Sequence, residues 1–312
     1  MIRRLHIDTD FAGDPDDVCA LAMLLGCPDA EVVGITTALE QDGRRNDCVR
    51  VVLGLLDRSN IPSAAGFART LTGKEFLCTA NDRRHWPQVP PRKRSRPGAA
   101  LDLLAASIDS GATVLAIGGF TNLAMLELAR PGSLQEVRIV AMAGWIDDPP
   151  PGWPCWGPSM DFNTQCDTTA ATIVASAGAA LSLVTVPVAM QASLQQSQLS
   201  RLRSCGEIGE LLANQSERHR ETSEFRELVQ RHDALPEDLV NFHWDPVAAG
   251  AALDWDCINM RPTALSAATQ NDVVQFIADG ESGSGFVSIA IDGPAFEQRW
   301  LDCIEAAAPL PR

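Results

Sequence analysis

The stretch LHIDTDFAGDPDDVCALAMLLG, residues 5–26, decides the fold because it joins an apolar strand to a helix through an acidic turn. Residues 5–10 form a short apolar run that is typical of a buried strand. Residues 16–26 are rich in Ala and Leu, and Asp14 followed by Pro15 is a common way for a helix to begin. We therefore expect a strand, a tight turn and a helix in this order.

The same alternation of strand and helix continues through most of the chain. Short apolar runs between helical segments are typical of a parallel sheet that is covered on both faces. We therefore predict an α/β fold, with an open, mostly parallel sheet, a Rossmann-like core and helices on both faces. We expect a single domain over residues 1–312, with a mainly helical insertion at about 195–256. Further strands are expected at 30–37, 61–66, 112–119, 136–144, 181–188 and 285–291, and further helices at 46–56, 99–109, 121–129, 167–178 and 294–307.

The charge balance excludes one class of partner. The 312 residues contain 25 Lys and Arg against 40 Asp and Glu, which gives a formal net charge of −15 at pH 7. A protein with this charge repels phosphate backbones, so we expect no nucleic-acid polymer among its partners.

The cysteine spacing and an uncharged segment indicate where in the cell the protein is expected. The nine cysteines are scattered without a C-x-x-C pair, which indicates neither a disulfide framework nor a zinc site. The opening residues MIRRLHIDTDF contain no apolar leader, so we expect a cytoplasmic protein. Residues 168–200 carry no charge, but Gly178, Pro187 and several glutamines favour a buried helix and strand over a membrane span.

Carboxylates are concentrated where the first strand meets the first helix. A helix start explains one or two of them, because acidic residues stabilise the first turn of a helix. The others lie at the carboxyl end of a strand, which is where parallel sheets bind ligands. Repulsion among so many like charges indicates a hard divalent cation, Ca²⁺ or Mg²⁺, with oxygen ligands. The cluster consists of Asp8, Asp10, Asp14, Asp16 and Asp17.

A competing interpretation starts from the same carboxylates. Asp-x-Asp at the end of a first strand also opens the haloacid-dehalogenase phosphatases, which need a lysine at a later strand end. The only lysines here are Lys74 and Lys93, and neither follows a predicted strand. This interpretation is therefore disfavoured.

Five blocks of sequence each lie at a predicted strand end or helix start. The blocks are DTDFAGDPDDVCAL at 8–21, GITT at 34–37, IGGFTNLA at 117–124, DFN at 161–163 with Asp167 after it, and WDPVA at 244–248. In this order, and together extending over residues 5–250, they resemble the inosine–uridine nucleoside hydrolase family (nucleoside N-ribohydrolases).

The resemblance implies a fold, a reaction and a set of site residues. It implies Ca²⁺-dependent hydrolysis of the N-glycosidic bond of ribonucleosides to ribose and free base. Ca²⁺ would be held by Asp10, Asp17, Asp245 and the backbone carbonyl of Thr121. Asp16, Asn163 and Asp161 would bind the ribose hydroxyls, and Asp10 would take a proton from the attacking water. The resemblance also implies a homodimer or homotetramer.

Several departures from the family pattern leave residue roles open. The first turn is two residues longer, so Asp14 competes with Asp16 for the ribose. Asp161 stands where the family usually has Glu. Glu40 or Asn46 would replace the family's Asn after the GITT block.

The residue before Asp245 bears on base specificity. Trp244 stands where many members carry a His that protonates the leaving base, which resembles the purine-specific branch of the family. There, aromatic rings sandwich the base and raise its basicity. Trp86 is our first candidate for the second ring, and Trp145, Trp153 and Trp156 are the others. In the alternative, Trp244 is a core residue and His243 or His85 protonates the base.

Two broader alternatives also stay open. The chain could hydrolyse a different ribosylated substrate, because the sugar-binding residues do not fix the base. It could also be a catalytically silent ligand-binding protein of the same fold. Loops 80–98 and 145–158 are candidate lids or binding loops, although the basic run in the first is also typical of a solvated loop.

Overall fold

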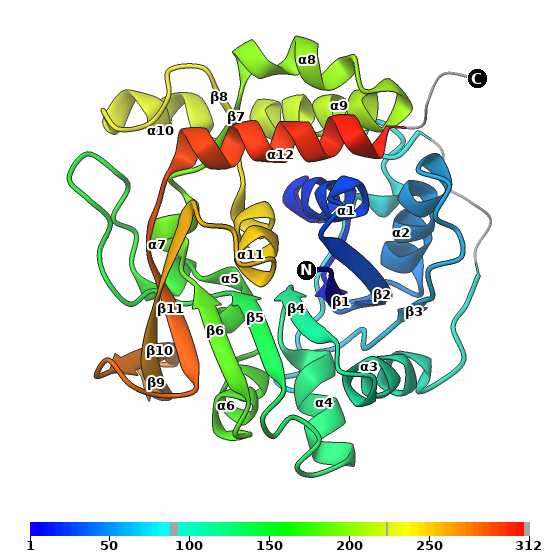
Figure 1. The fold of residues 1–312 in the computed structure, drawn as a ribbon, viewed down its shortest axis with the longest axis vertical. Helices are drawn as coiled ribbons and strands as arrows, with labels where there is room; N and C mark the ends of the chain where they lie inside the picture. Colours follow the sequence, from blue (N-terminus) through cyan, green and yellow to red (C-terminus); the bar gives the residue numbers. More distant parts are fainter. Residues whose placement is uncertain (88–92, 223, 309–312) are drawn as a thin grey trace.

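The structure, a computed structural model, describes residues 1–87, 93–222 and 224–308. Its main feature is a sheet of nine strands within these residues, in the order β10-β9-β11-β6-β5-β4-β1-β2-β3 (Figure 1). The strands are β1 Arg3–Thr9, β2 Ala30–Thr37, β3 Ser63–Ala65, β4 Thr113–Ile117, β5 Arg138–Met142, β6 Ala180–Val184, β9 Ile258–Gln270, β10 Val273–Asp279 and β11 Gly285–Ile291, with β7 Ser193–Gln195 and β8 Leu239–Phe242 forming a separate antiparallel pair.

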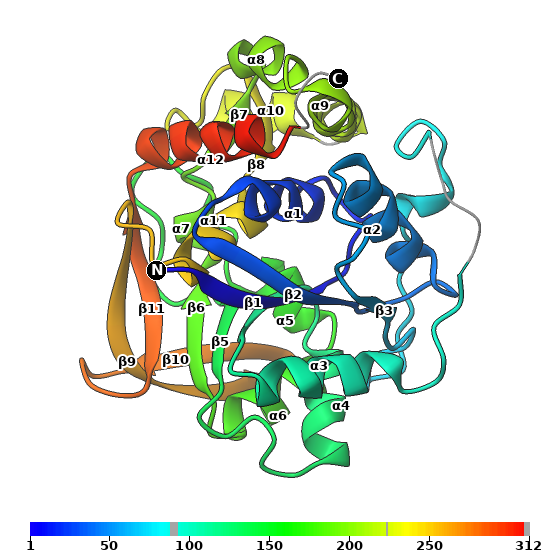
Figure 2. The same ribbon diagram turned by 45° about the vertical axis from the view of Figure 1, so that its right-hand side comes forward.

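Helices cover both faces of this sheet. In Figure 2, α1, α2, α11 and α12 lie on one side of the sheet, and α3, α4 and α6 lie on the other. The helices are α1 Asp16–Gly26, α2 Arg44–Leu55, α3 Ala99–Asp109, α4 Thr121–Ala129, α5 Phe162–Gln165, α6 Thr168–Ser176, α7 Val186–Ala189, α8 Leu199–Arg203, α9 Gly206–Thr222, α10 Phe225–Arg231, α11 Trp244–Ala252 and α12 Gly293–Ala307. The predicted α/β class and mostly parallel sheet are confirmed.

The strand order reverses direction between β1 and β4. β1 pairs in parallel with β2 on one side, with Ile7 opposite Ile35, and with β4 on the other, with Ile7 opposite Leu115. The chain builds outward from β1 through β2 and β3, and later from β4 through β5 and β6. In open α/β sheets, ligands bind at the carboxyl ends of the strands where the order reverses. This reversal lies beside Asp10.

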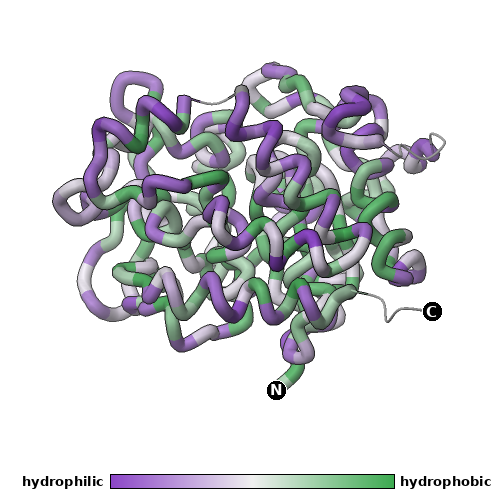
Figure 3. Tube along the Cα trace, turned by 90° about the horizontal axis from the view of Figure 1, so that it is seen from above, coloured by the Kyte–Doolittle hydropathy of each residue, from purple (hydrophilic) through white to green (hydrophobic). Residues whose placement is uncertain are grey.

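Two apolar cores flank the sheet. The larger packs β1 against α1 and α12 through Leu21, Met23 and Trp300, and the smaller packs the other face against α4 through Leu123. In Figure 3 the hydrophobic segments gather in the interior of the fold. None of the described helices is long and apolar enough to cross a membrane.

The 181–188 segment shows how proline divides an apolar run. The composition predicts one strand over 181–188, but β6 ends at Val184 and α7 starts at Val186. Pro187 lies in the first turn of α7, where its missing N–H costs no helical hydrogen bond. The predicted helix–strand pair of residues 168–200 is otherwise confirmed as α6 and β6.

The sequence pattern does not predict the antiparallel hairpin of β9 and β10. Half of β9 is exposed, so its apolar alternation is weak, and Pro262 argues against a strand. β9 accommodates Pro262 because it changes partner along its length. β11 pairs with residues 258–263 and β10 with residues 264–270.

Part of the predicted insertion lies between the two strands of the small sheet, and this part is mainly helical. α8, α9 and α10 lie between β7 and β8 and stack over α12 at the top of Figure 1. Helix α11 falls inside the predicted 195–256 range, but it packs against β5 and α1 and belongs to the helical layer on the main sheet.

Candidate active site

A cavity of about 690 Å³ opens at the carboxyl ends of four parallel strands. Asp10 follows β1, Ile117 ends β4, Met142 ends β5 and Val186 follows β6, and all four line the cavity. This is the edge of the sheet where the strand order reverses. The cavity is within the usual size range of small-molecule sites, roughly 300–1,000 Å³.

One end of the cavity is acidic. Five predicted site carboxylates line it, and the carboxylate oxygens of Asp14, Asp16 and Asp17 lie within 4.8 Å of one another. Asp17 is only 2% exposed and accepts a hydrogen bond from the Thr9 hydroxyl, so it lies behind the cavity wall. The five lining carboxylates are Asp10, Asp14, Asp16, Asp161 and Asp245.

Burial and mutual repulsion raise the pKa values of these acids. Burial is the main cause at Asp10, where it raises the pKa to about 6, and the charge of Asp14 adds to it. The pKa values of Asp16, Asp17 and Asp245 lie well above the ordinary range, again because of burial and then of neighbouring carboxylates. Ionising this cluster therefore requires a compensating positive charge.

Arg45 supplies part of that charge and shapes the turn, and the sequence interpretation did not identify it. Its side chain is 2% exposed and lines the cavity. The guanidinium donates to the carbonyls of Asp10, Phe11 and Leu39, the last at 2.8 Å. Arg45 therefore holds the turn that presents Asp10, in which Ala12 has a left-handed φ of 67°. Arginine is mostly exposed in proteins, so no sequence signal marks it.

The turn after β4 packs directly on Asp10. A Cβ atom at Gly118 would lie 2.5 Å from the Asp10 backbone nitrogen, so this close approach requires glycine. Thr121 begins α4 in this turn and is fully buried. Its hydroxyl donates to Asp167 Oδ2 at 2.6 Å, which leaves its backbone carbonyl as the group that the family resemblance assigns to the metal.

Asp161 and Asn163 are fixed to the end of β5. Asp161 Oδ2 accepts from the Gly144 N–H at 2.6 Å, and its Oδ1 accepts from the Thr164 N–H at 3.2 Å as the cap of α5. Asn163 donates to the Met142 carbonyl at 2.9 Å. Both residues line the cavity, and their positions are set by local hydrogen bonds.

A second group of lining residues is aromatic, and we call it the aromatic end. Trp244 packs on Phe242 with ring centroids 4.6 Å apart, and Trp156 lies 6.4 Å from Trp244. Trp156 comes from the predicted binding loop 145–158. Phe225, at the start of α10, packs edge-on against Phe242 at 5.5 Å. All four rings line the cavity.

Other predicted aromatic residues lie elsewhere. Trp86, our first candidate for the second stacking ring, is 1% exposed and packs against Phe11 in the core. Trp145 is also buried, and its indole donates to Asp148 at 2.9 Å. Neither they nor Trp153 line the cavity, so the structure brings Trp156 to Trp244 instead. Loop 80–98 includes residues 88–92, which lie outside the described residues.

The alternative acid His243 does not reach the cavity, contrary to our expectation. It is fully buried and packs against Trp300 with ring centroids 4.4 Å apart. Burial lowers the pKa of its imidazole to about 3, so it stays neutral. It precedes α11, so its side chain leaves the backbone on a different side from Trp244. His85 is half-buried and also does not line the cavity.

Asp8 joins strands and does not line the cavity. Its Oδ1 accepts from the Thr36 hydroxyl at 2.5 Å and from the Asn122 amide at 2.7 Å. It is 1% exposed, and burial raises its pKa to about 7. Asp8 therefore connects β1, β2 and α4 beneath the site.

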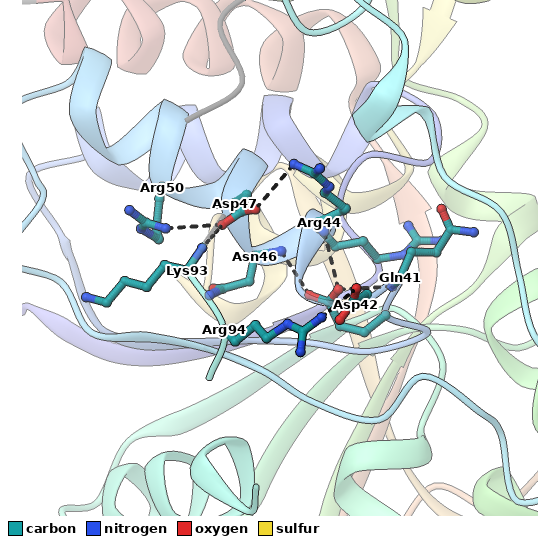
Figure 4. Close-up of polar contacts among 10 residues, drawn as sticks. Gln41, Asp42, Arg44, Asn46, Asp47, Arg50, Lys93 and Arg94 are labelled. Atoms are coloured by element: carbon teal, nitrogen blue, oxygen red, sulfur yellow. Dashed lines mark hydrogen bonds and ion pairs between the residues drawn. The ribbon is translucent and has the colours of Figure 1, made fainter. Parts of the chain in front are cut away.

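Glu40 stabilises the start of α2, where we expected a substrate ligand. Its carboxylate accepts from the Thr37 hydroxyl and from three backbone N–H groups, including that of Asn46 at 2.9 Å. Neither Glu40 nor Asn46 lines the cavity. Asn46 lines a second cavity of about 590 Å³ together with Arg50 and Lys93, and these residues surround Asp47 in Figure 4.

Replacing Glu40 by alanine tests this assignment. We expect the free energy of unfolding to fall by about 1–3 kcal/mol, because the first turn of α2 loses its acceptors. KM for a nucleoside should stay unchanged. Urea unfolding and steady-state kinetics measure the two quantities, and a raised KM with unchanged stability would restore Glu40 as a substrate ligand.

Comparisons with known proteins agree with this site. The family described as inosine-uridine preferring nucleoside hydrolase matches residues 5–298. Pyrimidine-specific ribonucleoside hydrolase RihA of Shewanella sp. (strain MR-4) is 31% identical over 217 residues, which cover 65% of this chain and 65% of that protein. The chain thus matches about two thirds of the length of this curated relative.

Solved structures share the fold at lower identity. The purine-preferring ribonucleoside hydrolase from Gardnerella vaginalis superposes with a TM-score of 0.81 and 20% identity, covering 99% of this chain and 100% of that one. An inosine-guanosine nucleoside hydrolase (IG-NH) superposes with a TM-score of 0.73 and 19% identity, covering 97% and 99%. Since the family match includes almost the whole chain, this chain belongs to the inosine-uridine preferring nucleoside hydrolase family.

Proposed function

We propose that this chain hydrolyses the N-glycosidic bond of ribonucleosides, with Ca²⁺ as its metal and a preference for purines. The observation that carries this proposal is that one cavity is lined both by a cluster of carboxylates and by a cluster of aromatic rings. Cleavage of this bond develops positive charge on the ribose ring and releases a flat base. Carboxylates stabilise the positive charge on the ribose, and aromatic rings bind the flat base.

The acidic end fits a hard divalent cation. Four buried acids with raised pKa values lie together, and in metal-free protein they repel one another. Ca²⁺ takes six to eight oxygen ligands in flexible geometry, which suits this set. When bound, the cation lowers the pKa of a water and orients the ribose diol. We propose Asp10, Asp17, Asp245 and the Thr121 carbonyl as ligands, and the short distances from Asp17 make Asp14 and Asp16 further candidates.

The remaining polar residues would bind and activate the reactants. Asp16, Asn163 and Asp161 would accept or donate hydrogen bonds to the ribose hydroxyls, with Asp14 as the alternative to Asp16. Asp10 would accept a proton from the attacking water.

The aromatic end supports the purine preference. Trp244 and Trp156 are tilted by 56° to each other, so a base would stack on one ring and meet the edge of the second. Purines offer more surface for this contact than pyrimidines do. Curated relatives of this chain are named pyrimidine-specific, so measuring which bases it prefers tests the proposed purine preference directly. We propose a small-molecule nucleoside as the substrate. We also propose that the chain forms a homodimer or homotetramer, and light scattering in solution tests this.

The base preference is tested with a nucleoside panel and a tryptophan variant. We expect higher kcat/KM for inosine, guanosine and adenosine than for uridine and cytidine. Stacking contributes about 1–3 kcal/mol per base, so Trp244→Ala should lower kcat/KM for inosine by about ten- to a hundredfold, and that for uridine by less.

Trp153→Ala is the matched control, because Trp153 lies in the same loop as Trp156 but does not line the cavity. It should keep the inosine activity of the unmodified chain. Equal or faster turnover of pyrimidines, or a Trp244→Ala variant with full purine kcat, would contradict the purine preference.

A further inference from the structure

Hydrolysis of a nucleoside needs a proton at the leaving base. Stacking on Trp244 would raise the basicity of the base, but it supplies no proton. The electron pair of the breaking C1′–N bond passes to the base, which leaves readily only if a ring nitrogen is protonated. Asp10 would act as the general base that accepts a proton from the attacking water, so it would not donate one to the leaving nucleobase. Trp244 carries no exchangeable acid of suitable pKa, and His243 is buried and neutral.

A different histidine reaches the cavity from the helical segment above it. His219, in the last turns of α9, is the one histidine among the described residues that line the cavity. Imidazole is the side chain whose ordinary pKa lies closest to neutral pH, so it can donate a proton there. The other carboxylates near it in the lining, Glu224 and Glu227, are exposed.

His219 lies beside the aromatic residues that line the cavity. Its ring packs edge-on against Phe225, with centroids 5.5 Å apart and an angle of 72°. Phe225 packs against Phe242 at 5.5 Å, and Phe242 packs against Trp244 at 4.6 Å. The imidazole therefore continues the wall on which the base would stack. A ribose held by the carboxylates at the other end would direct its base toward this wall.

Charged groups from several elements surround His219. Arg231 and Glu227 of α10 form an ion pair at 2.8 Å and line the same cavity, as does Glu224. His85 also lies near, because positive charge on His219 adds to the burial that lowers the pKa of His85. The charges that act on His85 or share the cavity lining are those of Asp82, Arg84, Glu224, Glu227 and Arg231 on other segments and of Arg218 on α9 itself, and the carboxylates of the acidic end line the same cavity.

We propose that His219 is the general acid that protonates the leaving base. This inference rests on the proposed nucleoside hydrolysis. The imidazolium donates one proton to a ring nitrogen of the base, such as N7 of a purine, while the C1′–N9 bond breaks and its electron pair stays with the base. The water oxygen bonds to C1′ and loses one proton to Asp10, so one water is consumed and no other reactant is needed. Solvent then returns a proton to His219.

The test compares a poor leaving group with a good one. We would measure kcat/KM for inosine and for 4-nitrophenyl β-D-ribofuranoside, whose nitrophenolate leaves without protonation. His219→Gln should lower kcat/KM for inosine by about a hundredfold or more and leave the nitrophenyl riboside nearly unchanged. His232→Gln, at the end of α10 and outside the cavity lining, is the matched control and should change neither activity.

The pH profile gives a second readout that a structural role would not change. In the unmodified chain, kcat/KM for inosine should fall at alkaline pH, because a general acid acts only while it carries its proton. This alkaline limb should be absent for the nitrophenyl riboside and in His219→Gln.

The two hypotheses fail in different ways. Full inosine activity in His219→Gln, or an equal loss on both substrates, would overturn the assignment of His219 and leave the proposed function in place. If the unmodified chain cleaves neither substrate, the proposed function fails, and the assignment of His219 fails with it.

Discussion

Replacing Asp10 by asparagine is expected to lower kcat for ribose release by about 10²- to 10⁴-fold, the usual contribution of a general base. Asparagine has nearly the same shape, so the hydrogen bonds from Arg45 to the backbone of the turn can persist. The variant removes the group that accepts a proton from water, and it removes one buried negative charge from the site.

The matched control is Asp8→Asn, two residues earlier on the same strand. Asp8 is equally buried, but it receives its hydrogen bonds from Thr36 and Asn122 on a single oxygen, which asparagine retains. We expect this variant to keep most of its activity. Thermal melts establish that both variants fold. Undiminished activity in Asp10→Asn would refute the assignment of Asp10.

Removal of Ca²⁺ is expected to abolish nucleoside hydrolysis and to destabilise the protein. With the cation at about 100 times its dissociation constant, the bound form gains about 2.7 kcal/mol. For a chain of this size the melting temperature should then rise by roughly 4 °C relative to chelated protein. Adding Ca²⁺ in excess of the chelator should restore both activity and melting temperature.

The size of this shift should depend on pH. Burial and neighbouring carboxylates raise the pKa values of Asp16, Asp17 and Asp245 in the metal-free fold well above the ordinary value of 3.8. The metal-free folded chain therefore binds more protons than the unfolded chain, and its stability falls as pH rises from about 4 through the raised pKa values. Asp10, with a pKa of about 6, adds to this loss between pH 4 and 7.

A bound cation removes this penalty because it stabilises the ionised carboxylates. The difference in melting temperature between Ca²⁺-loaded and chelated protein should therefore be larger at pH 8 than at pH 5. A difference that is the same at both pH values, or activity that survives chelation, would contradict the metal site at these carboxylates.

The acidic turn and the strands around it could be predicted because their signals are local. An apolar run ending in two aspartates marks β1, and the structure starts α1 at Asp16 and ends it at Gly26, as predicted. The five sequence blocks fall at strand ends or helix starts, and parallel pairing brings strand ends to one edge of the sheet. Asp10 follows from this geometry, whereas the family resemblance implies Asn163 and Asp245, and the structure places all three on one cavity.

Other parts of the site depend on contacts between distant segments, which the sequence does not encode locally. Arg45 lies in a basic run that reads as an exposed helix start, yet its guanidinium is buried against the carbonyls of Asp10 and Phe11. The sequence interpretation placed Trp86 ahead of Trp156, and only packing decides that Trp156 lines the cavity. His219 lies in the most charged part of the chain, where a histidine gives no functional signal.

Ribose release from nucleosides tests the central claim most directly. The unmodified chain, with Ca²⁺ in phosphate-free buffer, is incubated with inosine, guanosine, adenosine, uridine and cytidine, and both ribose and free base are quantified. The account predicts equal amounts of ribose and base, fastest from the purine nucleosides, and no release once Ca²⁺ is chelated. Binding of Ca²⁺ without release of ribose from any nucleoside would contradict it and favour a catalytically silent protein of this fold.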